Sequence, residues 1–217
     1  MKNKRKIYLA ASVGLLCAFV LWTVLVSRTD VEAIGPNGSL VGFSHINGWF
    51  HSLTGANMRL YTLTDWLGLV PIAVALAFAI SGLVQWIMRK HFLAVDHSIL
   101  VLGGFYIAVM AVYVLFEFVV INRRPVLIEG YLEASYPSST TMLVACVMPT
   151  AMMQIDRLVK NKTVRFCANA VIFVFIAFMV IGRLISGVHW LTDIIGGMLI
   201  SASLVTAYYA IAHCKGE

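Results

Sequence analysis

Long apolar runs alternate with short polar segments over the whole chain. A bilayer-spanning helix needs about 20 apolar residues, and the first run contains 20 residues without a charge. Five further apolar runs follow, and a single charged residue, Glu117, interrupts the third of the six. The pattern predicts an all-α bundle of six transmembrane helices, in residues 7–26, 66–88, 99–121, 138–153, 166–181 and 194–212.

The first apolar run follows a lysine-rich start, so a cleaved signal peptide is an alternative to a retained helix. The apolar region of a signal peptide is only about 7–15 residues long and is followed by a small-x-small cleavage site. The sequence Ser27-Arg28-Thr29-Asp30 offers no such site. We therefore expect a retained transmembrane helix.

Residues 27–65 form the longest segment outside the predicted spans, and Gly35-Pro36-Asn37-Gly38 marks a turn within it. Apolar residues at helical spacing then predict a short amphipathic helix at the membrane interface: Phe43, Ile46, Trp49, Phe50 and Leu53. This helix could be a lid, a lipid-entry wall or a simple anchor. His45 and His51 lie six residues apart, a poor spacing for a metal pair on a helix, and are interpreted as interface residues.

Composition supports the membrane assignment. Hydrophobic residues make up 60% of the chain, charged residues only 12%, and the mean hydropathy is +0.88, so we expect one integral membrane domain over residues 1–217. Loops on the side of the two termini hold 11 of the 16 Lys and Arg residues. The positive-inside rule therefore predicts cytoplasmic termini. Topology explains the net charge of +6, and no nucleic-acid motif is present.

A polar segment between the last two spans carries the candidate chemistry. His189 and Asp193 are four residues apart, so on a helix the carboxylate could orient the imidazole as a nucleophile or base. Arg183 could bind phosphate oxygens through its planar guanidinium. The alternative is structural, because a His and an Asp at a helix start can simply cap the helix and anchor it at the interface.

A second polar segment favours the chemical interpretation. Arg124-Pro125 and Pro137-Ser138 precede the Arg-x5-His-x3-Asp pattern that begins at Arg183. This ordered set resembles the three-part signature of the type 2 phosphatidic acid phosphatase superfamily. The members of that superfamily are membrane phosphatases that work through a phosphohistidine. The motifs that carry the resemblance lie within residues 117–193, and the predicted six-helix architecture extends the resemblance to the whole chain.

The resemblance implies a role for each matching residue. His189 would attack phosphorus and Asp193 would orient it, while Arg124, Arg183 and Ser138 would hold the phosphate oxygens. The guanidinium groups can supply the charge stabilisation that the transition state needs. No metal and no cofactor are therefore expected.

Three positions depart from the family pattern, and at the first of them Gly182 stands where the family has Ser. Glu117 stands where the family has Lys, and Thr140 stands where the family has the His that protonates the leaving oxygen. Without that acid an alkoxide leaves slowly, whereas a phosphate leaving group needs less help, so a polyprenyl diphosphate is favoured over phosphatidic acid. Glu117 could be neutral, pair with Arg123 or Arg124, or be a substitute acid.

Two functions follow from these residues. The first is a plasma-membrane lipid phosphatase or diphosphatase with its site on the external face; the second is a catalytically impaired relative that binds or moves phosphorylated lipid. The retained His189 and Asp193 favour the enzyme, because a binding protein needs no oriented imidazole. A channel or transporter is disfavoured, since no span carries a stripe of charges.

Overall fold

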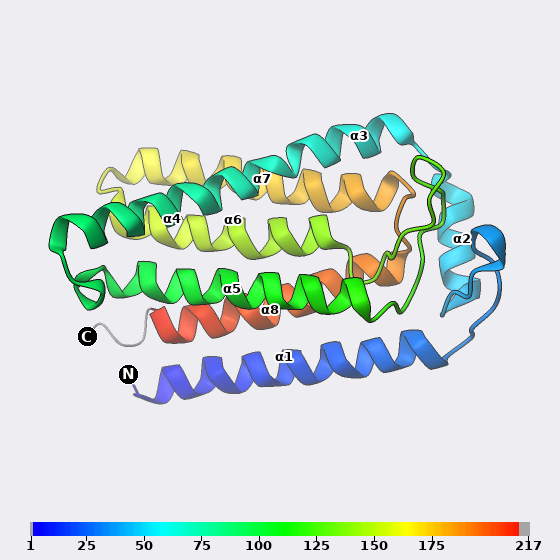
Figure 1. The fold of residues 1–217 in the computed structure, drawn as a ribbon, viewed down its shortest axis with the longest axis horizontal. Coiled ribbons are helices and arrows are strands. Elements are labelled where there is room, and N and C mark those ends of the chain that lie inside the picture. The colour runs from blue at the N-terminus through cyan, green and yellow to red at the C-terminus, as the bar shows by residue number, and fades with distance from the viewer. Residues whose placement is uncertain (1, 213–217) are drawn as a thin grey trace.

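A computed structural model of the protein describes residues 2–212, whose regular secondary structure is helical, with no strand among the described elements. The long helices run side by side, and the short helix α2 lies across one end of them (Figure 1). Two short 3-10 helices, at Pro36–Gly38 and Phe92–Ala94, lie in connecting segments. The α-helices are α1 Lys2–Arg28, α2 Ser44–Thr54, α3 Met58–Leu67, α4 Leu69–Arg89, α5 His97–Phe118, α6 Ser139–Leu158, α7 Lys162–Ile185 and α8 Leu191–Ala212.

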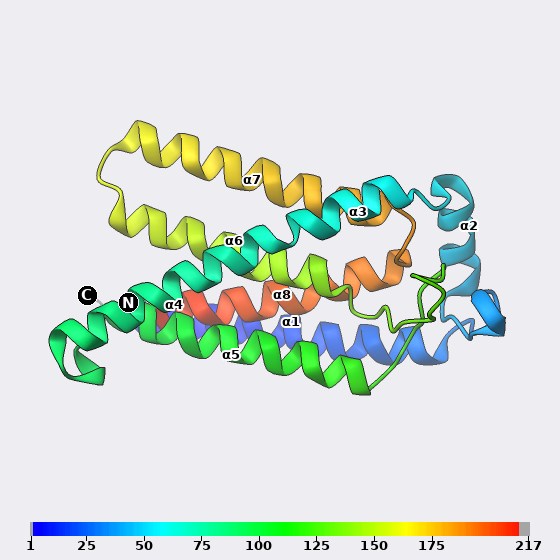
Figure 2. The ribbon, with the colours of Figure 1, turned by 45° about the horizontal axis from the view of Figure 1, so that its top comes forward.

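Helix α6 lies at the centre of the bundle. It packs against α4, α5, α7 and α8, while α1 covers the side of α8 away from α7 (Figure 2). Helices α3 and α4 form one rod, because Gly68 between them keeps helical backbone angles (φ −61°, ψ −17°) and its N–H donates to the Thr64 and Asp65 carbonyls. The start of this rod packs on α7, and its end meets α5.

Five of the six predicted spans coincide with helices that are long and apolar enough to cross a membrane. The exception is α6, which begins one residue after the start of the predicted span 138–153 and carries Gln154, Asp156 and Arg157 near its end. Neighbouring helices surround α6, and a helix in contact with protein needs fewer apolar side chains than one in contact with lipid. A sixth span therefore stays a prediction.

The segment 27–65 contains the predicted interfacial helix, which is α2. Its Ile46, Trp49 and Leu53 side chains are exposed, as an apolar face at an interface requires. The segment is more helical than the sequence predicted, because α3 begins at Met58 and not at Trp66. Asn57 explains this start, since its side chain accepts a hydrogen bond from the Leu60 N–H at 3.0 Å and caps the helix.

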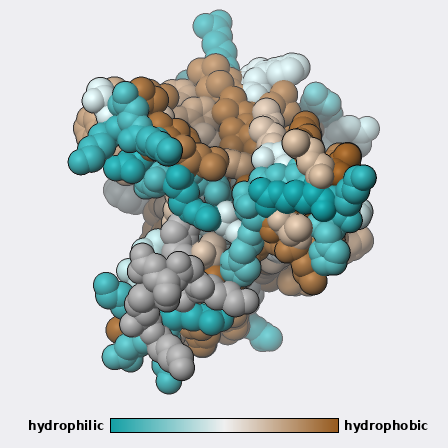
Figure 3. All heavy atoms as spheres, turned by 90° about the vertical axis from the view of Figure 1, so that its left-hand side faces the viewer, coloured by the Kyte–Doolittle hydropathy of each residue, from teal (hydrophilic) through white to brown (hydrophobic). Residues whose placement is uncertain are grey.

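The two ends of the bundle differ in charge. Helix α1 begins and α8 ends at the same end, where the α4–α5 and α6–α7 turns also lie, and hydrophilic side chains gather there (Figures 1 and 3). The motif residues Arg124, Arg183 and His189 lie at the opposite end. This separation matches the predicted arrangement of loops, while the cytoplasmic side of the termini stays a prediction. Cys214 and Lys215 lie outside the described residues.

Candidate active site

A tight loop between α7 and α8 positions His189. Gly187 in this loop has a φ of +65°, and a Cβ there would lie 1.7 Å from the Gly55 carbonyl oxygen. Only glycine fits this close approach. The Asn57 N–H donates to the Ser186 carbonyl at 2.9 Å and ties the loop to the segment between α2 and α3.

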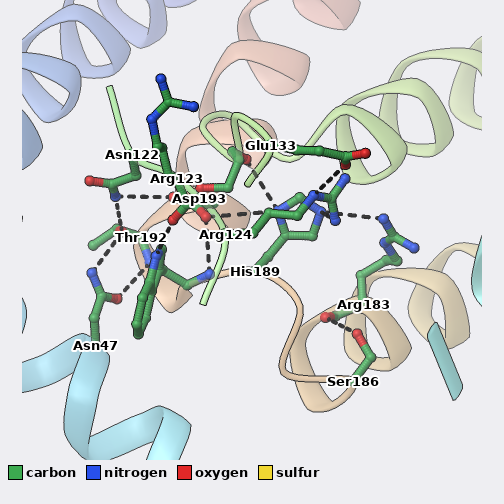
Figure 4. Close-up of polar contacts among 12 residues, drawn as sticks. Asn47, Asn122, Arg123, Arg124, Glu133, Arg183, Ser186, His189, Thr192 and Asp193 are labelled. Atoms are coloured by element: carbon green, nitrogen blue, oxygen red, sulfur yellow. Dashed lines mark hydrogen bonds and ion pairs between the residues drawn. The ribbon is translucent and has the colours of Figure 1, made fainter. Parts of the chain in front are cut away.

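The His189 ring lies between two contrasting environments (Figure 4). Its Nδ1 atom is 3.1 Å from the Ser135 carbonyl oxygen and 3.7 Å from Asp193 Oδ2. On the other side, Nε2 is 3.4 Å from Arg124 Nη1 and 3.3 Å from Arg183 Nη2. The structure thus brings the four motif residues together, and it adds a backbone carbonyl as the nearest partner of Nδ1.

Asp193 is held by hydrogen bonds that do not involve His189. It is completely buried and accepts from the Trp190 N–H at 3.0 Å and from Asn122 Nδ2 at 3.2 Å. The bond from Trp190 is one half of a capping box at the start of α8, so the structural role proposed for Asp193 is also present. The sequence reasoning missed Asn122, whose only signal was its place in the polar segment before Arg124.

Arg124 and Arg183 reach the histidine from different elements. Arg124 lies on a short extended segment. The Arg124 N–H donates to the Glu133 carbonyl at 3.0 Å, and Arg124 Nε is 3.0 Å from Glu133 Oε2. Arg183 is 1% exposed and lies in the last turn of α7, with Nη1 3.5 Å from Asp65 Oδ1. Two cations can be buried together because each has its own carboxylate partner.

Tyr61 provides a shared surface for both guanidinium groups. Its ring centroid is 4.9 Å from Arg183 Cζ and 5.9 Å from Arg124 Cζ. A cation over an aromatic face within about 6 Å is attracted to it. Tyr61 and Asp65 come from α3, which the sequence had assigned to a loop, so neither was predicted as a site residue.

The surroundings of His189 keep its imidazole neutral. Burial, followed by the charges of Arg124 and Arg183, holds the pKa of His189 well below its ordinary value of 6.5. The Ser135 carbonyl can only accept, so the proton belongs on Nδ1 and the lone pair on Nε2. The lone pair of Nε2 therefore faces the two guanidinium groups.

A cavity of about 350 Å³ has His189 in its wall. His189 and Arg124 line it together with the last turns of α5, the start of α6 and the loop 133–137. Glu117 and Glu133 both contribute to its wall. Glu117, the residue that departs from the family pattern, is thus placed in the same cavity as the histidine.

The two remaining motif positions lie at the start of α6. The Ser138 hydroxyl is buried and has no hydrogen-bond partner among the described residues, and the same holds for Arg183 Nε. Buried polar atoms without a partner suit a site for an anion. Thr140 is not among the residues that line the cavity, and its methyl group lies toward Gly68.

Metal donors gather elsewhere in the described part of the chain. Asp30, Glu32 and His45 are the group of acidic and histidine side chains whose ligand atoms lie within 4.8 Å of one another. None of them lines the cavity. His45 Nδ1 is 2.7 Å from Asp30 Oδ1, so the histidine joins the end of α1 to the start of α2 as an ion pair when protonated.

Comparisons with known proteins relate this chain to a family and to a solved fold. Residues 118–216 match the PAP2 superfamily. The fold is similar to that of the first transmembrane PAP2 type phosphatidylglycerolphosphate phosphatase from Bacillus subtilis, with a TM-score of 0.50 and 20% sequence identity over 91% of this chain and 93% of that one. No curated protein matches the sequence.

Proposed function

We propose that this chain, which belongs to the PAP2 superfamily, is an integral membrane phosphatase that hydrolyses a phosphorylated lipid through His189. The observation that supports the proposal most strongly is the position of His189 Nε2, 3.4 Å from Arg124 Nη1 and 3.3 Å from Arg183 Nη2. A neutral nitrogen that faces two cations is arranged to attack a group that those cations bind. Phosphate is such a group.

The chemistry proceeds in two displacements. His189 Nε2 attacks the terminal phosphorus, and the bond from that phosphorus to the leaving oxygen breaks, which releases the lipid monophosphate from a diphosphate or the lipid alcohol from a monoester. Water then hydrolyses the P–N bond to release inorganic phosphate. Arg124 and Arg183 bind the non-bridging oxygens, whose negative charge they stabilise in the transition state. The Ser138 hydroxyl is available as a further donor, because it has no other partner among the described residues.

The ring becomes cationic when Nε2 bonds to phosphorus, and two groups near Nδ1 stabilise that charge. The Ser135 carbonyl accepts the Nδ1 proton at 3.1 Å, and the Asp193 carboxylate lies 3.7 Å away. Asp193 is in turn fixed by Asn122. We expect Asp193 to act electrostatically and through the capping of α8, which positions the loop that carries His189.

A polyprenyl diphosphate is the substrate that the site favours. Thr140 cannot donate a proton near neutral pH, and a phosphate leaving group depends less on a donor than a lipid alkoxide does. We place the reaction at the external face of the plasma membrane, because the basic loops of the opposite end favour the cytoplasmic side.

A catalytically impaired protein that binds or moves phosphorylated lipid is the second candidate. The replacement of the family Lys and His by Glu117 and Thr140 favours it. Such a protein would keep Arg124 and Arg183 for binding. It would have no need of an imidazole with a free Nε2.

Phosphate release separates the two functions. Purified protein in detergent is supplied with a polyprenyl diphosphate and with phosphatidic acid, and His189→Ala is compared with His91→Ala, a histidine at the other end of the bundle. We expect faster release from the diphosphate, complete loss in His189→Ala and unchanged rates in His91→Ala. Retained turnover in His189→Ala would exclude the phosphohistidine route, and lipid binding without any release by the wild type would support the second candidate.

A further inference from the structure

Glu117 occupies the catalytic cavity without a cation of its own. It lies in the last turn of α5, is exposed and lines the cavity with His189 and Arg124. Tyr113, one helical turn earlier, also lines the cavity.

The ion pairs of the site distinguish Glu117 from the other carboxylates. Glu133 is 3.0 Å from Arg124 Nε, and Asp65 is 3.5 Å from Arg183 Nη1. No ion pair joins Glu117 to any cation in the part of the chain that the structure describes. Each guanidinium is therefore already matched by one carboxylate, and Glu117 is the additional negative charge.

A lipid phosphate in this cavity brings more negative charge beside that additional carboxylate. Like charges in one site disfavour ionisation, so one of the groups takes up a proton. Glu133 and Asp65 each have a guanidinium partner, whereas Glu117 has none in the described part of the chain. Glu117 is therefore the carboxyl group of this cavity that is available to exchange a proton with a bound substrate.

We propose that Glu117 is the general acid of this enzyme and donates its proton to the leaving oxygen in the place of the histidine that Thr140 replaces. The inference rests on the proposed phosphatase function.

The proton and charge balance closes over the two displacements. In the first, His189 Nε2 bonds to phosphorus, the P–O bond to the lipid breaks, and the Glu117 proton moves to the lipid oxygen, which leaves as an alcohol. In the second, water attacks phosphorus, the P–N bond breaks, and the Glu117 carboxylate takes the proton that the water loses. Inorganic phosphate departs, and both His189 and Glu117 return to their neutral forms.

This role has a consequence for substrate range. A diphosphate and an aryl phosphate leave without much help from an acid, so they react whether or not Glu117 can donate. An alkyl monoester such as phosphatidic acid depends on the donor. Glu117 therefore extends the activity from diphosphates to monoesters.

The test compares leaving groups in the same full-length protein in detergent. We would measure kcat/KM of the wild type, Glu117→Gln and Glu117→Asp with phosphatidic acid, p-nitrophenyl phosphate and a polyprenyl diphosphate. Glu129→Gln is the matched control, because it makes the same charge change in an exposed residue that does not line the cavity.

We expect Glu117→Gln to lower kcat/KM for phosphatidic acid by about 100-fold or more, the lower bound for general acid catalysis, and to change the other two substrates little. Glu117→Asp keeps a carboxyl group and should retain part of the activity toward phosphatidic acid. The fall of kcat/KM at high pH, where Glu117 loses its proton, should be absent in Glu117→Gln. Activity toward p-nitrophenyl phosphate also shows that the variant is folded.

Two results would overturn the inference while leaving the phosphatase intact. One is an equal loss with all three substrates in Glu117→Gln, which indicates a role in binding or structure. The other is full activity of Glu117→Gln toward phosphatidic acid. A wild type that hydrolyses none of the three substrates would instead contradict the proposed function itself.

Discussion

Individual side chains set the reactivity of His189. Its ring is 3% exposed and faces Arg124 and Arg183, and both effects favour the neutral imidazole. In an unfolded chain the ring would take up a proton below about pH 6.5. Because the pKa of His189 is lowered in the folded protein, its contribution to stability is complete above that pH and is lost as the pH falls through the folded value.

The lowered pKa of His189 also predicts where kcat/KM falls on the acid side, or acid limb, of its pH profile. Only neutral His189 can attack phosphorus, so kcat/KM should stay high below pH 6.5, the ordinary pKa of the ring. Arg183→Gln removes one of the charges that lower this pKa, and the limb should move to higher pH as the overall rate falls. The comparison uses one substrate for both proteins, so the ionisation of the substrate cancels. A limb that stays in place in Arg183→Gln would show that another group controls it.

Sequence reasoning identified most residues of the site but not all of their contacts. The resemblance to the phosphatase signature implied that His189, Asp193, Arg124 and Arg183 meet, and they do. It could not predict the Ser135 carbonyl, because a backbone acceptor has no sequence signature. Tyr61 and Asp65 were not predicted for a related reason, since their contacts with the guanidinium groups depend on how α3 packs against α7.

The apolar pattern predicted best the helices that are long and apolar enough to cross a membrane. Helices α1, α4, α5, α7 and α8 lie where the hydrophobic runs predicted spans. The pattern was less informative at the start of α3, where an Asn57 cap and not hydrophobicity fixes the boundary. It was also less informative at α6, whose partly polar sequence reflects contact with neighbouring helices.

The loop between α7 and α8 supplies a prediction at this scale. Gly187→Ala introduces a Cβ that would lie 1.7 Å from the Gly55 carbonyl oxygen in a backbone conformation with φ of +65°. Gly38→Ala is the matched control, since Gly38 has a φ of +71° but nothing within 4 Å of the added atom. We expect Gly38→Ala to cost about 1–2 kcal/mol of the free energy of unfolding, the ordinary penalty of a left-handed residue.

Gly187→Ala should cost more than this and should also lower kcat, because the displaced loop carries His189. Thermal unfolding in detergent and phosphate release would measure the two effects. Equal losses of stability in the two variants, with full activity in Gly187→Ala, would mean that the close approach to Gly55 does not position the histidine.

The whole molecule separates a basic end from the end that holds the site. The α4–α5 and α6–α7 turns share the end where α1 begins, and the positive-inside rule assigns that end to the cytoplasm. We expect a cysteine at Tyr131, which is 74% exposed, to react with an impermeant maleimide in intact cells. A cysteine at Lys160 should react only after permeabilisation. Both substitutions would be made in a background without native cysteines, and labelling of position 160 but not of 131 in intact cells would reverse the topology.

The central claim is that His189 forms a covalent bond to phosphorus, and trapping this intermediate tests it most directly. Protein is mixed with a polyprenyl diphosphate labelled in its terminal phosphate, quenched in alkali, where phosphohistidine survives, and digested for mass spectrometry. We predict phosphate on the peptide that contains His189, lost on acid treatment and absent from His189→Ala. Two results would contradict the account. One is a wild type that turns over the substrate while no phosphate appears on this peptide at any time of quenching. The other is label on another residue that persists in His189→Ala.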